Sequence, residues 1–293
     1  MMKPAVRNTL QFIGRAFALI GVIFVVLRLR LYWSEIDLAR IAIPGRLLIA
    51  ALSIVSGLSV LILATIWRRT LLALQAPVSL PWAIKTYCVT QLAKYLPGNV
   101  FHYAARQGTG MAANISAIVL AKSFFWEIII SLSAALSLGA LALPLLLARC
   151  SMPTSVLLFM LVVVFIYLCL RRIVNKHMAI AFLMQLSFLL IIGGIFASLL
   201  SLVCEKSLPD NLWPALIGAY IIAWLIGFVT PGASGGIGVR EMVALFLLQA
   251  FIPESTLLMA IILARMVSVV GDVFAFLIGH LVVSSKKIMN VDL

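Results

Sequence analysis

Val229-Thr230-Pro231-Gly232-Ala233-Ser234-Gly235-Gly236-Ile237-Gly238-Val239-Arg240 interrupts an otherwise apolar stretch that runs from Trp213 to Phe251. Four glycines fall within positions 232–238, directly after a proline that cannot continue a helix. Inside a bilayer every backbone amide must be paired within the protein, so irregular chain is tolerated only where it is buried or lines a wet cavity. The segment therefore predicts a helix that breaks within the membrane beside a polar space.

A second segment has the same organisation. The stretch from Pro81 to Ala113 is broken at Pro97-Gly98, and an arginine follows the proline by nine positions, as Arg240 follows Pro231. Downstream of the two breaks, Leu120-Ala121-Lys122 corresponds to Leu263-Ala264-Arg265, each early in a long apolar run. Agreement in order and spacing at three places predicts an internal duplication.

The composition indicates that the chain folds in lipid rather than in water. Of the 293 residues, 64% are hydrophobic and only 11% are charged, whereas soluble domains are about half apolar. Since a bilayer crossing needs about 20 apolar residues, the chain predicts six full spans and leaves no room for a soluble catalytic domain. The predicted spans cover residues 9–27, 47–67, 115–147, 153–170, 178–204 and 256–283.

These elements predict an all-α polytopic membrane protein with six spans and two broken, re-entrant helical hairpins. The whole chain, 1–293, forms one transmembrane domain, with repeat 1 over about 9–147 and repeat 2 over about 153–283. A hairpin that re-emerges on its own side leaves three crossings in each half, and this odd number inverts the second repeat relative to the first.

The basic residues between spans predict the orientation. Cytoplasmic loops carry an excess of Lys and Arg, and both termini are cytoplasmic if the more basic loops and the tail lie inside. The residues on this side are Arg68, Arg69, Arg171, Arg172, Lys176, Lys286 and Lys287. Four arginines between 28 and 46 would lie outside, offset in part by two acidic residues.

Each restarted helix predicts an anion site. Unpaired amide hydrogens and the helix dipole give its N-terminus a partial positive charge that suits phosphate or carboxylate. Arg106 and Arg240 lie a turn or two beyond these ends, and the guanidinium fork binds phosphate through two parallel hydrogen bonds. As alternatives, Arg240 pairs with Glu241 or Glu127, and Arg106 extends to a lipid headgroup.

Further polar residues surround the two breaks. Lys122 and Glu127 lie five positions apart and do not face one another on a helix, whereas Arg265 and Asp272, seven apart, share one face. The complete set of predicted substrate-binding residues is Lys94, Tyr95, Gly98, Asn99, His102, Arg106, Lys122, Glu127, Gly232, Ser234, Gly235, Gly236, Arg240, Glu241, Arg265 and Asp272.

Other classes of function have little support. The cysteines Cys88, Cys150, Cys169 and Cys204 lack CxxC spacing, so a metal or redox role has little support, and we expect no metal and no cofactor. The sequence has no phosphate-binding GxxxxGK loop that would indicate an energy source. The formal charge of +13 is scattered between apolar spans rather than gathered on one element, so nucleic acid is not an expected partner.

At the two Pro-Gly breaks the sequence resembles the lysylphosphatidylglycerol synthase transmembrane-region family, the flippase-like module of bacterial multiple peptide resistance factors. The residues that carry the resemblance are Tyr95-Leu96-Pro97-Gly98 with Arg106, and Pro231-Gly232 with Gly235-Gly236-Ile237-Gly238-Val239-Arg240-Glu241. The resemblance covers residues 10 to 285 and implies a bacterial cytoplasmic (inner) membrane protein, without the synthase domain. The family commonly has an acidic-basic pair early in the helix after the first break, where this chain has Lys122 and, later, Glu127.

The resemblance and the breaks together predict a flippase for an anionic phospholipid or a polyprenyl-phosphate-linked sugar. Two alternatives stay open: an integral membrane enzyme acting on a lipid-phosphate sugar, with His102, Glu127 or Glu241 as acid or base, and a non-catalytic partner that presents lipid to a glycosyltransferase. Association with a glycosyltransferase or with a second copy of the chain is also left open.

Overall fold

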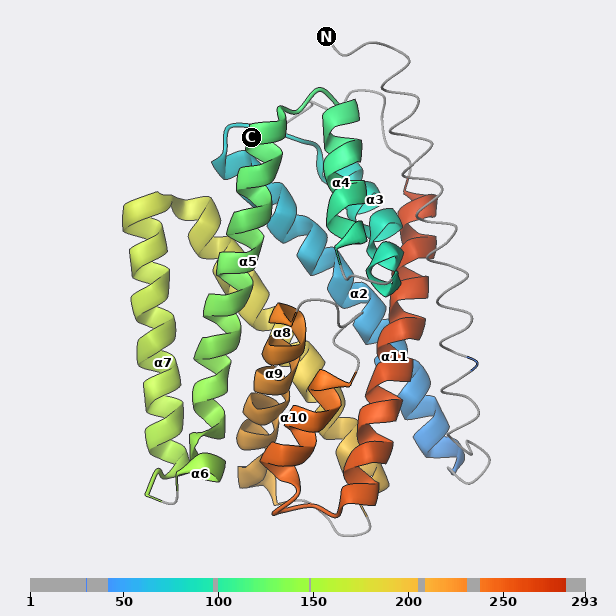
Figure 1. Cartoon of the computed structure of the whole chain (residues 1–293), viewed down its shortest axis with the longest axis vertical. Coiled ribbons are helices and arrows are strands. Elements are labelled where there is room, and N and C mark those ends of the chain that lie inside the picture. Colours follow the sequence, from blue (N-terminus) through green and yellow to red (C-terminus); the bar gives the residue numbers. More distant parts are fainter. Residues whose placement is uncertain are drawn as a thin grey trace.

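The computed structural model describes residues 42–96, 100–147, 149–204, 209–230 and 238–282, together with Arg30. Within these ranges every regular element is a helix (Figure 1). In chain order the elements are α2 (Ile43–Ala73), α3 (Leu80–Gln91), η2 (Leu92–Tyr95), α4 (Phe101–Ala112), α5 (Ala117–Gly139), η3 (Ala140–Ala142), α6 (Leu143–Leu146), α7 (Met152–Cys169), η4 (Leu170–Val174), α8 (Lys176–Val203), η5 (Asp210–Leu212), α9 (Trp213–Val229), α10 (Val239–Leu248) and α11 (Glu254–Leu281).

Five helical segments are long and apolar enough to cross a membrane. They contain 23–31 residues each, more than the roughly 20 that a bilayer requires. They coincide with five of the six predicted spans, and the predicted span 9–27 lies outside the described residues. The chain is thus a polytopic helical membrane protein, and its spanning segments are Ile43–Ala73, Ala117–Leu146, Met152–Val174, Lys176–Val203 and Glu254–Leu281.

Polar and proline residues define where the spanning helices begin. Ser116 accepts a hydrogen bond from the amide of Val119, and Ser151 accepts one from Thr154, so each caps the helix that follows. Asn175 caps α8 in the same way, its side-chain oxygen 3.0 Å from the amide nitrogen of Met178. Pro44 stands in the first turn of α2, where its missing N–H costs no hydrogen bond.

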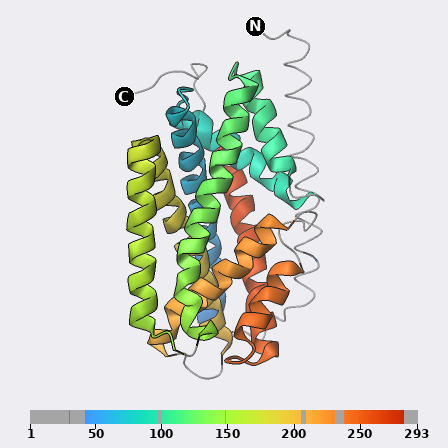
Figure 2. The same ribbon diagram turned by 60° about the vertical axis from the view of Figure 1, so that its left-hand side comes forward.

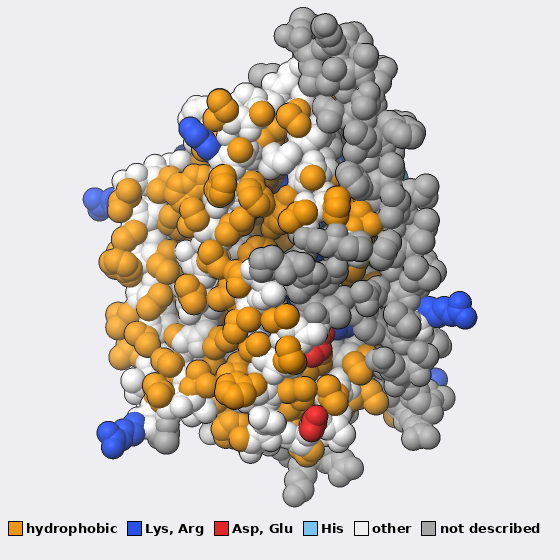
Figure 3. All heavy atoms as spheres, in the orientation of Figure 1, with side chains coloured by type: hydrophobic (Ala, Val, Ile, Leu, Met, Phe, Trp, Pro, Cys, Tyr) orange, Lys and Arg blue, Asp and Glu red, His pale blue; other side chains and the backbone are white. Residues whose placement is uncertain are grey.

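Helix α7 lies at the edge of the molecule and faces the lipid. Ser155 is its one buried residue, and it donates a hydrogen bond to the carbonyl of Ala140. The rest of the helix is apolar around its whole circumference, as expected of a span in contact with acyl chains. Figure 3 shows hydrophobic side chains spread across the described part of one face, with few charged side chains among them, which agrees with a bilayer around the bundle.

The two segments predicted to be broken are interrupted in the structure. In the first, α3 and η2 end before residue 97 and α4 begins at Phe101, and in the second, α9 ends at Val229 and α10 begins at Val239. The arms of each hairpin contact one another. Figure 1 shows the first hairpin in the upper half of the molecule and the second in the lower half, with their interrupted ends toward the middle, and Figure 2 keeps this separation.

The bundle is organised around α2, α8 and α11. Helix α2 packs along α8 and α11, while α5 packs against α8 and α9, and α11 packs against α2 and α3. The largest cluster of buried apolar residues therefore joins α2, α5, α8, α9, α10 and α11. Both hairpins pack against these long helices.

Two glycines allow α2 and α11 to cross at backbone contact. A Cβ atom on Gly271 would lie 2.7 Å from the Ser56 hydroxyl oxygen and 2.8 Å from the Gly57 nitrogen, and one on Gly57 would lie 2.7 Å from the Gly271 carbonyl oxygen. Small residues at helix crossings in membranes permit this close approach.

We expect Gly271→Ala to lower stability by about 1–3 kcal/mol, because the added methyl forces the two backbones apart. The measurement is thermal unfolding of the purified protein in a mild detergent. The matched control is Gly194→Ala on α8, where a Cβ meets nothing within 4 Å, so stability should be unchanged or slightly raised. Equal melting temperatures for Gly271→Ala and the natural protein would contradict this account of the crossing.

Candidate functional site

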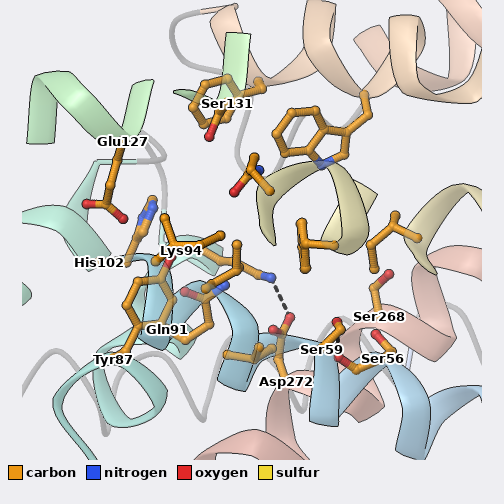
Figure 4. Close-up of a pocket in the computed structure, with 18 of the residues that line it drawn as sticks. Ser56, Ser59, Tyr87, Gln91, Lys94, His102, Glu127, Ser131, Ser268 and Asp272 are labelled. Carbon is orange, nitrogen blue, oxygen red and sulfur yellow. Dashed lines mark hydrogen bonds and ion pairs between the residues drawn. The ribbon is translucent and has the colours of Figure 1, made fainter. Parts of the chain in front are cut away.

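A cavity of about 160 Å³ lies between the two interrupted hairpins and the long helices. Its wall contains residues from α2, α3, η2, α4, α5, α8, α9, α10 and α11, so every element of the central bundle contributes. The volume exceeds the roughly 30 Å³ that a water molecule occupies in the liquid several times over. Figure 4 shows Lys94 and Asp272 in its middle, with Glu127 and His102 on one side and Ser56, Ser59 and Ser268 on the other.

The first ion pair at the cavity joins α4 to α5. The Arg106 guanidinium donates a 3.0 Å hydrogen bond to the Glu127 carboxylate. It also faces the rings of Tyr87 at 4.1 Å, Tyr103 at 5.1 Å and Trp67 at 5.4 Å. These aromatic faces are attractive to a cation, so Arg106 is held in a closed cage of one carboxylate and three rings.

Arg106 therefore does not occupy its predicted place. Its side chain is 2% exposed, so the alternative that it extends to a lipid headgroup is wrong. Glu127, Tyr87 and Tyr103 line the cavity, and Arg106 lies behind them. The prediction that Arg106 contacts the ligand is corrected to one in which it positions these three side chains.

The second ion pair joins the end of the first hairpin to α11. The Lys94 ammonium lies 2.6 Å from the Asp272 carboxylate, and the Tyr95 hydroxyl donates a hydrogen bond to the same carboxylate oxygen. Asp272 is buried, whereas Lys94 is one quarter exposed and reaches the cavity. All three residues line the cavity, as the sequence predicts.

The third ion pair joins α10 to α11. Arg265 donates a hydrogen bond from Nε to one carboxylate oxygen of Glu241 at 2.8 Å, and its terminal nitrogen lies 2.7 Å from the same oxygen. Arg265 lines the cavity, and Glu241 lies behind it. Like Arg106 and Glu127, this pair joins the second arm of a hairpin to the long helix that follows it, but here the arginine is on the long helix.

Arg240 is the cation that lines the cavity without a carboxylate partner among the described residues. Its guanidinium faces the ring of Tyr220 at 6.0 Å, and its Nε is buried with no hydrogen bond to any part of the chain that the structure describes. The alternatives in which it pairs with Glu241 or Glu127 are wrong, because these carboxylates bind Arg265 and Arg106.

The remaining predicted residues fall into three groups. His102 lines the cavity, whereas Lys122 is exposed on α5 and is absent from the cavity wall, so its predicted binding role is not supported. Lys122 lies five positions before Glu127 on α5, so its side chain is on a different face of the helix from the one that lines the cavity. The residues at the breaks themselves, Gly98, Asn99, Gly232, Ser234, Gly235 and Gly236, lie outside the described residues.

Sequence reasoning missed a set of uncharged polar residues on the cavity wall. Two glutamine amides and several hydroxyls face it from five helices, α2, α3, α5, α8 and α11. The sequence does contain a signal for them: each is a single polar residue in an apolar stretch, and burying such a residue without a partner is costly. These residues are Ser56, Ser59, Gln91, Ser131, Gln185 and Ser268.

The described residues contain no cluster of three or more side chains able to hold a metal ion. Comparison with protein-family models and with curated protein sequences gave no match. The resemblance noted above therefore depends on the two Pro-Gly segments and their arginines, and the chemistry of the site must be argued from its own geometry.

We expect Glu127→Leu to destabilise the protein by about 3–5 kcal/mol, because it leaves Arg106 buried without its counter-charge. The measurement is resistance of the detergent-solubilised protein to unfolding by added ionic detergent. The double variant Arg106→Met/Glu127→Leu removes both charges and should recover most of the loss. A double variant as unstable as the sum of its single changes would show that the two residues do not act as a pair.

Proposed function

We propose that this protein is a flippase that moves an anionic lipid across the bacterial cytoplasmic membrane, with the lipid phosphate bound in the central cavity. The substrate is an anionic phospholipid or a polyprenyl-phosphate-linked sugar. The observation that carries the proposal is Arg240, a cavity-lining arginine with no carboxylate partner among the described residues.

The balance of charge around the cavity favours an anion. Asp272, Glu127 and Glu241 are each bound to a cation, so the ion pairs neutralise one another and Arg240 remains in surplus. A charge near the middle of a membrane costs about 2.5–3.5 kcal/mol on insertion scales, and such residues usually serve a pathway or a ligand. A phosphate on Arg240 would supply the missing counter-charge through charge-assisted hydrogen bonds.

The packing of the helices supports an inverted pair of repeats. If α2, α3, α4 and α5 correspond to α8, α9, α10 and α11, the main contacts among these eight helices pair off between the two halves. Thus α3 packs on α11 as α9 packs on α5, and α2 packs on α11 as α8 packs on α5. The hairpins point into the bundle from opposite ends, as inverted repeats require (Figure 1). Movement of one such repeat against the other opens a central site alternately to the two sides.

The basic residues support an orientation with both termini in the cytoplasm. The C-terminal end of α2, which carries Arg68 and Arg69, lies at the same end of the molecule as the junction of α7 and α8 (Figure 1). That junction carries Arg171, Arg172 and Lys176. A cluster of this kind is typical of the cytoplasmic side.

The enzyme alternative has less support than the flippase. Glu127 and Glu241, two of its three candidate acid–base groups, are engaged by arginines. A scaffold that presents lipid to a glycosyltransferase would not need an uncompensated arginine at a cavity, because such a charge is costly to insert.

The proposal is tested in liposomes that contain the purified protein and a small amount of phosphatidylglycerol with a fluorescent group on one acyl chain. Chemical quenching of the outer leaflet measures how fast labelled lipid crosses, and we expect protein-dependent crossing. A parallel assay with a labelled polyprenyl phosphate sugar tests the second substrate class. No protein-dependent crossing of either lipid would contradict the flippase, and a chemically altered headgroup would favour the enzyme.

We expect Arg240→Ala to slow crossing roughly tenfold or more, because a hydrogen bond to a charged group contributes about 1.5–3 kcal/mol. The matched control is Arg172→Ala, which removes the same charge from an exposed position remote from the cavity wall. Both variants should insert and unfold like the natural protein. Undiminished crossing by Arg240→Ala would remove Arg240 from the site.

A further inference from the structure

Two buried glutamines face the cavity with their amides unused. Gln185 on α8 is 3% exposed and Gln91 at the end of α3 is 7% exposed, and both line the cavity. Within the described ranges neither side chain forms a hydrogen bond, and the same is true of the hydroxyls of Ser131 and Ser268 on the same wall. The cavity therefore holds polar groups that do not stabilise the fold through internal bonds.

Uncharged amides of this kind need partners from outside the chain. An amide or hydroxyl that leaves bulk water without gaining a hydrogen bond destabilises a protein. Each glutamine offers two donors and one acceptor oxygen, and each serine can donate and accept. Groups that also both donate and accept, such as the hydroxyls of a sugar or a polyol, match this mixed set.

The charges on the wall disfavour a cationic headgroup. The carboxylates of Asp272 and Glu127 reach the cavity but are each bound by a cation, and Glu241 is held by Arg265 behind it. The aromatic cage of Tyr87, Tyr103 and Trp67 is occupied by Arg106. An ammonium on the ligand would meet the positive charges of Arg240 and Lys94. The carboxylates that it could approach are each already matched by a cation of the chain, although Oε2 of Glu127 accepts no hydrogen bond within the described residues.

We infer that the headgroup beyond the phosphate is uncharged and rich in hydroxyls, and that Gln91 and Gln185 select it. This inference depends on the proposed function, since it assumes a lipid phosphate at Arg240. It narrows the substrate class to polyol- or sugar-bearing lipid phosphates and excludes aminoacylated phospholipids.

Binding is measured with the full-length protein in nanodiscs, by competition against a fluorescent phosphatidylinositol. The competitors are phosphatidic acid, phosphatidylinositol and lysyl-phosphatidylglycerol with identical acyl chains, and, separately, a polyprenyl phosphate with and without a hexose. We expect the hydroxyl-bearing member of at least one series to bind about tenfold more tightly than its bare phosphate. Lysyl-phosphatidylglycerol should bind more weakly than phosphatidylinositol.

The variants separate the two parts of the site. Gln185→Ala and Gln91→Ala should each weaken binding of the preferred hydroxyl-bearing lipid about threefold to tenfold and leave the bare lipid phosphate unchanged. The matched control is Gln249→Ala, which removes an exposed amide outside the cavity. Arg240→Ala should weaken every lipid in the series.

The outcomes distinguish failure of this inference from failure of the proposed function. Equal binding of bare, hydroxyl-bearing and lysylated lipids, all lost in Arg240→Ala, would overturn the inference and leave the anion site in place. Selective binding of the lysylated lipid would overturn it as well. Binding of no lipid phosphate by the natural protein, in either series, would overturn the proposed function and this inference with it.

Discussion

The low dielectric of the bilayer is the constraint on which this structure depends, because each charge inside it must meet an opposite charge or a ligand. Three ion pairs satisfy most of the buried charges, and each of them joins a hairpin arm to a long helix. Lys94 joins the first hairpin to α11 through Asp272, and Arg106 joins its second arm to α5 through Glu127. The ion pairs thus help to fix both hairpins to the long helices.

Much of the fold could be predicted because its signals are local. An apolar run long enough to cross a bilayer is visible in the sequence, and so is a proline that ends a helix within such a run. The predicted interruptions after Tyr95 and after Val229 are present for this reason. The span Ile43–Ala73 extends beyond its predicted window, 47–67, at both ends, since Arg68 and Arg69 continue α2 past its apolar part.

The candidate site was less predictable because its partners come from separate helices. Arg106 and Arg240 follow their prolines at the same distance, yet one is enclosed by Glu127 and three aromatic rings while the other faces the cavity. That difference depends on which rings and carboxylates the neighbouring helices present. Gln91 and Gln185 were overlooked for a related reason: an isolated amide in an apolar span becomes informative only when its surroundings show that it has no internal partner.

The ion pairs also differ in how far apart their members lie along the chain, and this has a consequence for biosynthesis. Glu127 follows Arg106 by 21 residues, so this pair can form while the first half of the protein is being inserted. Asp272 follows Tyr95 by 177 residues, and the carboxylate that binds Lys94 is that of Asp272. Lys94 can therefore meet this carboxylate only after α11 has been synthesised.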